Sequence, residues 1–476
     1  MAQIDLTKLT LTGARESLRR GDFSSLELVE AYLSAVEEKN SKLNAYLEVF
    51  ADEARAAARA ADERQRQGKG LGELDGLPIA VKDNILIEGH IASAGSKILK
   101  SYRAAYNATV IKKLKAAGAI FLGRTNMDEF AMGSSTENSA YGPTKNPRDE
   151  TRVPGGSSGG SAAVVAADLA LAALGSDTGG SIRQPAAFCG AVGLKPTYGA
   201  VSRFGLMAMA SSLDQIGTIT KTVADAELLF DIIKGRDPLD STSAATTNYQ
   251  PPISKLRVGV PWHFFQDSLS SDVLGNFKQA LKCLEQAGHK VREVDLPNVK
   301  YALPCYYVLI PAEVSANLAR YDGLRYGDHQ SGDDLLGDYL KTRGRGFGPE
   351  VRRRIMLGTY VLSAGYYDVY YGQAQKVAGL IRAELAQVFT GVEAIATPTT
   401  PTAAFKLGEK TADPLQMYLA DIFTVPANIA GLPAISIPSG DDSSGLPLGL
   451  QLMSAAGRED ILFSLGQDFE HARPLP

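Results

Sequence analysis

Two glycine- and serine-rich segments in the middle of the chain contain the residues best suited to chemistry. They span residues 155–161 and 175–181, and the Ala/Val/Leu segment between them predicts a buried helix because it is apolar on every face. Turns so rich in glycine bring backbone N–H groups close to a ligand. That ligand could be a phosphate, the backbone of a partner, or a carbonyl group attacked by a serine.

A phosphate is the least suitable of these ligands. A P-loop needs Lys and then Ser or Thr directly after its last glycine, and neither segment supplies the Lys. The G-x-G-x-x-G pattern of dinucleotide-binding proteins is also absent from both segments. We therefore do not expect these turns to bind a nucleotide.

Residues 155–159 match the G-x-S-x-G pattern of a nucleophile elbow, with Ser157 in the position of the nucleophile. That pattern requires a buried strand that runs directly into it, whereas the residues before Gly155 are polar and interrupted by proline. The histidines farther along the chain lie in ordinary amphipathic segments and offer no clear partner for a Ser-His-Asp triad. The pattern therefore disfavours a hydrolase of that type.

A lysine at the end of an apolar run offers another base. Lys82 follows Leu77–Val81, which predicts a short buried strand after a glycine turn. Burial destabilises the ammonium form of lysine and lowers its pKa, so that the side chain can accept a proton near neutral pH. An isolated lysine at a strand end would by default extend into solvent. The residues alone therefore leave a serine–lysine pair and a solvent-exposed Lys82 as alternatives.

The composition is that of an ordinary globular chain. Its 476 residues are 45% hydrophobic and 21% charged, and 49 Lys and Arg against 53 Asp and Glu give a formal net charge of −4. This balance argues against a chain that binds nucleic acid by itself through its phosphates. Three scattered cysteines and the lack of a Cys/His cluster predict neither a disulfide framework nor a metal site. With no signal-like N-terminus and no membrane-spanning apolar run, we expect a soluble cytoplasmic protein.

Helical and strand patterns alternate along the chain. The first 70 or so residues look helical, and Ser24 with Glu27 forms a capping-box pattern there. A helix that begins after Asn107 leads into a strand at residues 119–122, as βαβ units require. We therefore predict an α/β fold whose central mixed β-sheet is covered by helices on both faces.

The rest of the chain continues this alternation. Further strands are predicted at residues 256–260, 290–296, 394–396, 434–438 and 448–452. Residues 349–385 predict one long or kinked helical region, and residues 237–253 resemble a linker. The long polar loop before Gly155 is expected to be functional, because it leads directly into the first glycine-rich segment.

The domain prediction is one domain over residues 1–476, with a helical region at about 1–70, a catalytic core at about 71–235 and a C-terminal part at about 236–476 that carries pocket residues.

With Lys82 and the segments GGSSGGS and GSDTGGSIR, the chain resembles the amidase signature family over nearly its full length. The resemblance implies a catalytic lysine, a serine held by a cis peptide bond and a nucleophilic serine, which fall on Lys82, Ser157 and Ser181. Ser181 would attack an amide carbonyl, Ser157 would relay its proton and Lys82 would be the final base. The oxyanion hole would consist of the N–H groups of Thr178, Gly179, Gly180 and Ser181.

Four more segments resemble one branch of this family, the glutaminase subunits of tRNA-dependent amidotransferases. They are residues 128–147, 317–327, 353–371 and 413–438. The resemblance implies hydrolysis of glutamine and transfer of the ammonia to a partner that converts Glu-tRNA(Gln) to Gln-tRNA(Gln) with ATP, with Asp-tRNA(Asn) left open as a second substrate. The implied partners are amidotransferase subunits B and C in a heterotrimer. No cofactor is expected in this chain, and ATP and Mg²⁺ are expected in the partner.

Glutamine carries an α-carboxylate and an α-ammonium group, so its pocket needs one fixed cation and one fixed anion. By the same resemblance, Arg354 would bind the carboxylate, Asp421 would bind the ammonium group and Tyr306 would line the site. Without the resemblance, Arg354 would be an exposed helical charge and Asp421 an ordinary helix residue. A free-standing amidase acting on another small amide remains the alternative, and it would not require these two residues.

Overall fold

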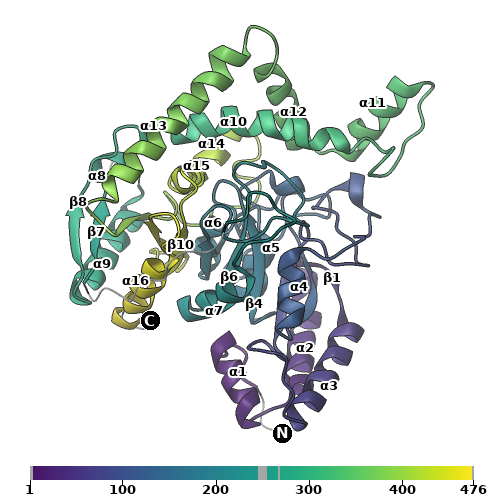
Figure 1. Cartoon of the computed structure of the whole chain (residues 1–476), viewed down its shortest axis with the longest axis vertical. Coiled ribbons are helices and arrows are strands. Elements are labelled where there is room, and N and C mark those ends of the chain that lie inside the picture. The colour runs from purple at the N-terminus through teal and green to yellow at the C-terminus, as the bar shows by residue number, and fades with distance from the viewer. Residues whose placement is uncertain (1–3, 245–254, 266–268, 474–476) are drawn as a thin grey trace.

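A single mixed β-sheet runs through the centre of the computed structural model, which describes residues 4–244, 255–265 and 269–473 (Figure 1). The eleven strands of the described residues are β1 (Tyr46–Val49), β2 (Pro78–Lys82), β3 (Ile120–Thr125), β4 (Ala172–Asp177), β5 (Val192–Lys195), β6 (Gln215–Thr220), β7 (Arg257–Val260), β8 (Lys290–Glu293), β9 (Ala394–Pro398), β10 (Ala434–Asp441) and β11 (Pro447–Ser454). Their order across the sheet is β1-β3-β2-β4-β6-β5-β10-β11-β9-β7-β8. β3, β2 and β4 are parallel neighbours, as are β9, β7 and β8, whereas the remaining pairs are antiparallel.

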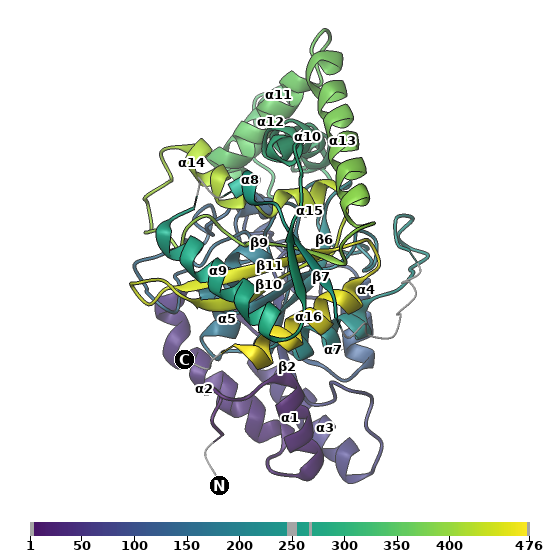
Figure 2. The ribbon, with the colours of Figure 1, turned by 90° about the vertical axis from the view of Figure 1, so that its left-hand side faces the viewer.

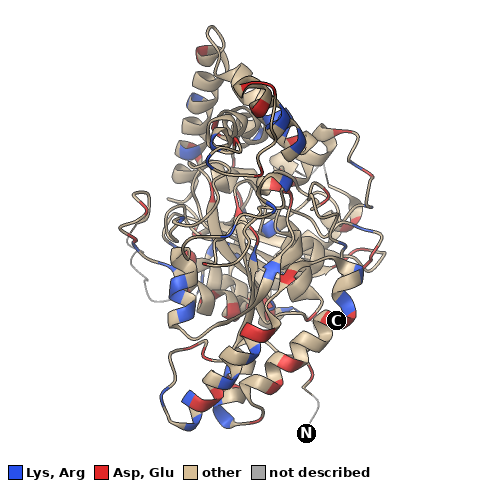
Figure 3. Ribbon diagram, turned by 90° about the vertical axis from the view of Figure 1, so that its right-hand side faces the viewer, with Lys and Arg blue, Asp and Glu red and all other residues tan. Residues whose placement is uncertain are grey.

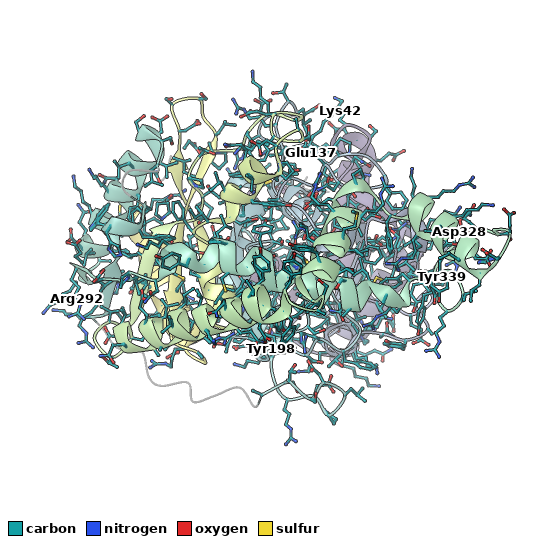
Figure 4. The ribbon with its side chains drawn as sticks, turned by 90° about the horizontal axis from the view of Figure 1, so that it is seen from above. Lys42, Glu137, Tyr198, Arg292, Asp328 and Tyr339 are labelled. Atoms are coloured by element: carbon teal, nitrogen blue, oxygen red, sulfur yellow. The ribbon has the colours of Figure 1, made fainter. Side chains whose placement is uncertain are left out.

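Helices surround this sheet and extend beyond it at both ends. The α-helices of the described residues are α1 (Leu11–Arg20), α2 (Ser25–Leu43), α3 (Ala51–Arg66), α4 (Thr109–Ala116), α5 (Gly159–Ala166), α6 (Arg183–Cys189), α7 (Val223–Ile233), α8 (Trp262–Phe265), α9 (Ser271–Gln286), α10 (Ala302–Asn317), α11 (Leu335–Gly346), α12 (Pro349–Val361), α13 (Gly372–Val388), α14 (Pro414–Tyr418), α15 (Val425–Ile429) and α16 (Glu459–Ala472). α1, α2 and α3 lie at the end of the molecule near the N-terminus, and α10 to α13 lie at the opposite end (Figure 1). Seen from above, Asp328 and Tyr339 lie at one extremity of the molecule and Arg292 at the other (Figure 4).

The predicted coverage of both faces of the sheet is confirmed. Neighbouring residues of a strand point to opposite faces, and β10 shows this. Ser436 lies on the face covered by α6, because a side-chain carbon on Gly449 beside it would lie 2.8 Å from Ala187. Ile437 lies on the opposite face, where α16 packs closely enough that a side-chain carbon on Gly466 would lie 2.9 Å from it. α9 and α16 are seen across that face in Figure 2.

Two buried parallel strands bring the predicted chemistry together. β2 and β4 are neighbours in the sheet, with Ala80 opposite Ala173, and every residue of both strands is buried. Their carboxyl ends therefore meet at the same edge of the sheet, where α/β proteins commonly place their sites. Lys82 ends β2, and the second glycine-rich segment follows from β4. The sheet thus joins residues that lie about a hundred positions apart in the chain.

The segment between the two glycine-rich motifs is not one helix, and that prediction was wrong. α5 ends at Ala166, the chain turns through Asp168 at φ 61°, and β4 begins at Ala172. A continuous apolar run has no polar positions to mark its period, so a short buried helix and a buried parallel strand give the same signal. Gly175 consequently lies within β4 and not in a turn.

The helical region predicted at residues 349–385 is divided into separate helices. α12 ends at Val361 and α13 begins at Gly372, after the π turn η5 (Tyr367–Tyr371). Gly365 between them has φ 83°, a left-handed conformation that interrupts a helix. The two helices stand apart at the top of Figure 1.

Most of the other predicted elements are confirmed. The capping box of Ser24 and Glu27 is present at the start of α2, and all the predicted strands occur with small shifts in their ends. β1, β4, β5 and β6 were missed. Part of the linker-like segment predicted at 237–253 lies outside the described residues. The single-domain boundaries remain a prediction.

The distribution of charged residues along the chain matches the nearly balanced composition. In the view of Figure 3, Lys and Arg lie interspersed with Asp and Glu along the ribbon. Within the described part of the chain, no helix has both the length and the apolar character needed to cross a membrane.

Candidate active site

Lys82 lies at the end of β2 with its ammonium group enclosed by serine side chains. Nζ donates to the Oγ atoms of Ser157 and Ser158, each 2.8 Å away, and to Ser176 Oγ at 2.9 Å. The side chain is fully buried, and burial lowers the pKa of Lys82 to about 7 although nearby carboxylates oppose the shift. The structure therefore excludes the solvent-exposed alternative, and Lys82 can be neutral near pH 7.

Two of these serines were not identified from the sequence. Ser158 and Ser176 share Lys82 with Ser157, and Ser158 Oγ also donates to the Ser176 carbonyl oxygen at 3.1 Å. The signal was present, because both residues stand in the glycine-rich segments that contain the predicted catalytic serines. What the spacing did not show was which serine hydroxyls point at the lysine.

Ser157 and Ser181 differ in their access to solvent. A cis peptide bond joins Gly156 to Ser157, and the Ser157 side chain is fully buried against Lys82. Ser181 is 8% exposed, whereas Ser157 and Lys82 are 0% exposed. Ser158 N donates to the Ser181 carbonyl oxygen at 3.1 Å, which holds the two glycine-rich segments together. A nucleophile must reach its substrate, so this arrangement favours Ser181 for attack and Ser157 for proton transfer.

The turn before Ser181 presents backbone N–H groups. Gly180 has φ 143°, and a side-chain carbon there would lie 2.2 Å from a threonine Oγ1, so only glycine fits. The predicted use of Gly180 as an oxyanion donor needs correction, because its N–H donates to Asp177 Oδ1 at 2.8 Å. Three of the predicted donors have no hydrogen-bond partner among the described residues: the N–H groups of Thr178, Gly179 and Ser181.

A buried ion pair that the sequence reasoning missed holds this turn. Asp177 accepts from Arg183 Nε at 3.0 Å, and both side chains are fully buried. Burial raises the pKa of Asp177, but the charge and hydrogen bonds of Arg183 outweigh burial and bring the pKa to about 2. Arg183 also donates to Asn428 Oδ1 at 2.6 Å and Gln451 Oε1 at 2.7 Å. The turn is thereby tied to α15 and β11.

A second buried carboxylate holds the other side of the turn. Asp214 Oδ1 accepts from Thr178 Oγ1 at 2.7 Å, and Asp214 Oδ2 accepts from Met209 N at 2.9 Å. Burial raises the pKa of Asp214 to about 6, although these hydrogen bonds oppose the shift. Nothing in the sequence around Asp214 distinguished it, because its partner lies 36 residues away.

Tyr306 and Asp421 come from separate elements and lie against this turn, and Arg354 lies close enough to both for its charge to act on them. Tyr306 of α10 covers Gly179, where a side-chain carbon would lie 2.7 Å from Tyr306 Oη. Asp421 lies beside Gly180, where such a carbon would lie 3.0 Å from Asp421 Oδ1. Arg354 of α12 is buried, and its charge acts on both Tyr306 and Asp421. The structure thus places a fixed cation and a fixed anion near Ser181.

Asp421 has one carboxylate oxygen free for a ligand. Ser134 Oγ donates to Asp421 Oδ2, whereas the buried Oδ1 has no hydrogen-bond partner among the described residues. Burial raises the pKa of Asp421 to about 7. An ammonium group placed against Oδ1 would favour the ionised carboxylate and lower that pKa. The site is therefore suited to a cationic group of a substrate.

A serine nucleophile in this site can be tested without knowledge of its substrate. A fluorophosphonate should label Ser181, and the labelling rate should increase with pH around a midpoint near 7, because Lys82 must be neutral to accept a proton. Mass spectrometry of the labelled peptide measures both the site and the rate. Lys82→Met should slow labelling and remove the pH dependence. Labelling at Ser157, or a rate that does not change between about pH 5.5 and 8.5, would contradict this assignment.

The chain matches a known family over most of its length. The profile of the family described as Amidase matches residues 27–463. The chain is similar to the A subunit of the glutamyl-tRNA(Gln) amidotransferase of Chloroflexus aurantiacus, with 53% identity over 472 residues, 98% of this chain and 97% of the relative.

Solved structures give the same result for the fold. The crystal structure of the A subunit of glutamyl-tRNA(Gln) amidotransferase from Thermotoga maritima matches with a TM-score of 0.82 and 43% identity, covering 100% of this chain and 97% of that chain. The peptide amidase from Stenotrophomonas maltophilia matches with a TM-score of 0.81 and 30% identity, covering 98% and 97%. The chain thus shares its fold with an amidotransferase subunit and with a peptide amidase.

Proposed function

The chain belongs to the amidase signature family, and on that basis we propose that it is the glutaminase subunit of a tRNA-dependent amidotransferase. The observation that best supports the amide substrate is the buried Lys82 bonded to Ser157 beside the accessible Ser181. The observation that favours glutamine is the pair of opposite charges, Arg354 and Asp421, near that nucleophile.

The proposed reaction begins with attack on the amide. Ser181 Oγ would bond to the carbonyl carbon while its proton passes to Ser157 and a proton of Ser157 passes to neutral Lys82. The oxygen would then carry a negative charge, which the N–H groups of Thr178, Gly179 and Ser181 would stabilise. Loss of one such donor commonly lowers the rate by about 10²–10³-fold.

The second half of the reaction would reverse these transfers. Cleavage of the carbon–nitrogen bond needs a proton on the leaving nitrogen, and Lys82 would return one through Ser157 so that ammonia leaves. A glutamyl ester on Ser181 would remain. Water would then add to this ester with the same base, and glutamate would be released. Lys82 would thus act as base and acid in turn, as a pKa near 7 allows.

The ammonia would be used by partner subunits. The named relatives are subunits of glutamyl-tRNA(Gln) amidotransferases, so we propose that this chain works with subunits B and C, where ATP and Mg²⁺ would be bound. An exposed apolar surface supports assembly, because Met356, Leu357, Tyr360, Tyr366 and Tyr370 are all at least 40% exposed. Only one charged residue, Asp368, occurs between residues 355 and 371. Such a surface is better suited to a protein than to a nucleic acid.

Ammonia release from glutamine tests the proposed activity. The chain, expressed with candidate partner subunits, should release ammonia, and Ser181→Ala should lower the rate by a factor on the order of 10³–10⁶. A coupled glutamate dehydrogenase assay measures this rate. Ser101→Ala changes an exposed serine and should have no effect. Full activity in Ser181→Ala would eliminate the mechanism, and a chain that purifies alone and hydrolyses simple amides but not glutamine would favour a free-standing amidase.

The role of Arg354 can be tested on the same assay. Arg354→Met should lower kcat/KM for glutamine by about 10²-fold, mainly by raising KM, because hydrogen bonds to a charged group are worth about 1.5–3 kcal/mol each. Arg352→Met is the matched control, since Arg352 is exposed on the same helix. Equal kinetics for the two variants would show that Arg354 does not bind the substrate.

A further inference from the structure

One edge of the Arg354 guanidinium is hydrogen-bonded to the protein, and the other edge is not. Its Nε donates to Glu350 Oε1 at 2.8 Å. Of the described residues, Glu350 alone is hydrogen-bonded to this side chain, so Nη1 and Nη2 remain for a ligand. Two parallel N–H donors of a guanidinium match the two oxygens of a carboxylate. The orientation of the guanidinium therefore decides whether these two N–H donors point into the pocket, where a substrate carboxylate would bind.

Glu350 is a shared acceptor at the start of α12. Oε1 accepts from Arg354 Nε and also from Tyr418 Oη at 2.9 Å, while Oε2 accepts from Arg353. Glu350 precedes Arg354 by one helical turn, the favoured order for such a pair. Within this group, two guanidinium charges face one carboxylate. One positive charge is thus left for a substrate to neutralise.

Two stacked aromatic rings lie beside the guanidinium of Arg354. Tyr307 of α10 and Tyr418 of α14 stack with their centroids 3.8 Å apart and 19° between their planes. Arg354 Cζ lies 5.3 Å from the centroid of Tyr307 and 5.5 Å from that of Tyr418. Since Cζ is almost equally far from both centroids, the guanidinium lies beside the stacked pair, where the rings limit its movement. Glu350 and the two rings together restrict the orientation of Arg354.

The helix that carries this arrangement is itself anchored to the loop after β3. Gly348 N, directly before α12, donates to Glu129 Oε2 at 2.8 Å, and Ser96 Oγ donates to Glu129 Oε1. The same loop contains Ser134, which donates to Asp421. One loop therefore contacts both the start of the helix that carries Arg354 and Asp421 itself.

We propose that Glu350 and Tyr418 are positioning residues that make the enzyme select amides bearing an α-carboxylate, because they orient the guanidinium of Arg354. The inference rests on the proposed function in one respect, the binding of a substrate carboxylate by Arg354. Without Glu350, the long arginine side chain regains rotamer freedom and loses its fixed orientation. Recognition of the carboxylate weakens, whereas the reacting amide at Ser181 is not affected.

Two substrates separate these effects. Glutamine and 4-aminobutanamide, which is glutamine without its α-carboxylate, are compared by kcat and KM in the complex that co-purifies with the chain. Glu350→Ala should raise KM for glutamine about tenfold with kcat nearly unchanged, and should leave the kinetics of 4-aminobutanamide as they are. Tyr418→Phe should raise KM for glutamine about threefold, since it loses one neutral hydrogen-bond donor but keeps the ring.

Tyr301→Phe is the matched control for Tyr418→Phe. The Tyr301 side chain is 48% exposed and its hydroxyl has no hydrogen-bond partner among the described residues, so its removal should leave both substrates unaffected. If Glu350→Ala does not fold, the activity on 4-aminobutanamide is lost too, and the comparison of Tyr418→Phe with Tyr301→Phe decides. Equal kinetics for these two tyrosine variants would then overturn the inference, as would an unchanged glutamine preference in a folded Glu350→Ala.

Arg354→Met separates failure of this inference from failure of the proposed function. If Arg354→Met removes the preference for glutamine but Glu350→Ala and Tyr418→Phe keep it, Arg354 binds the carboxylate without help, and only the positioning role is wrong. If Arg354→Met leaves the preference unchanged, both the positioning role and the proposed binding of glutamine through Arg354 are wrong.

Discussion

The structure depends on the burial of one ammonium group among neutral partners. Lys82 is fully buried, and its hydrogen bonds are made to serine hydroxyl groups and a carbonyl oxygen. Burial of an unpaired charge is unfavourable, so the neutral form gains relative to the ammonium form, and a lysine becomes a base near pH 7. A carboxylate in direct contact would reverse this effect. The serine-rich composition of the two segments therefore serves the acid–base chemistry of the lysine as well as the nucleophile.

The sheet supplies the conditions for that burial. Lys82 and Ser176 meet because β2 and β4 are parallel neighbours whose carboxyl ends share an edge. β3 and β6 flank these two strands in the sheet, and every residue of β2 and β4 is buried. Gly156 and Gly180 then allow the backbone to pass where any side chain would collide. The same fold thus produces the dry environment and the close approach that the chemistry needs.

Two carboxylates near the site differ in whether a cation is paired with them. Asp177 is paired with Arg183, which keeps it ionised and makes it a rigid support for the turn before Ser181. Asp421 is buried with one oxygen unpaired, so its charge is poorly stabilised until a cation arrives. A paired carboxylate stabilises the structure, and an unpaired one is prepared for a ligand. Asp177 therefore supports the structure of the site, whereas Asp421 is suited to binding the substrate.

The sequence by itself determined the local chemistry of this protein. Glycine-rich segments, the lysine at the end of an apolar run and the alternation of helices and strands were sufficient to predict an α/β sheet and to make Lys82 a candidate base, because each depends on neighbours within a few residues. The roles of Ser157 and Ser181 came from the resemblance to a known family. Arg354 and Asp421 needed a resemblance to a known family, since nothing in their local sequence separates them from surface charges. The tertiary structure alone decided which groups meet across long separations. Asp214 holds Thr178, Arg183 reaches Gln451, and Tyr418 holds Glu350, and these contacts depend on packing between elements that no local pattern records.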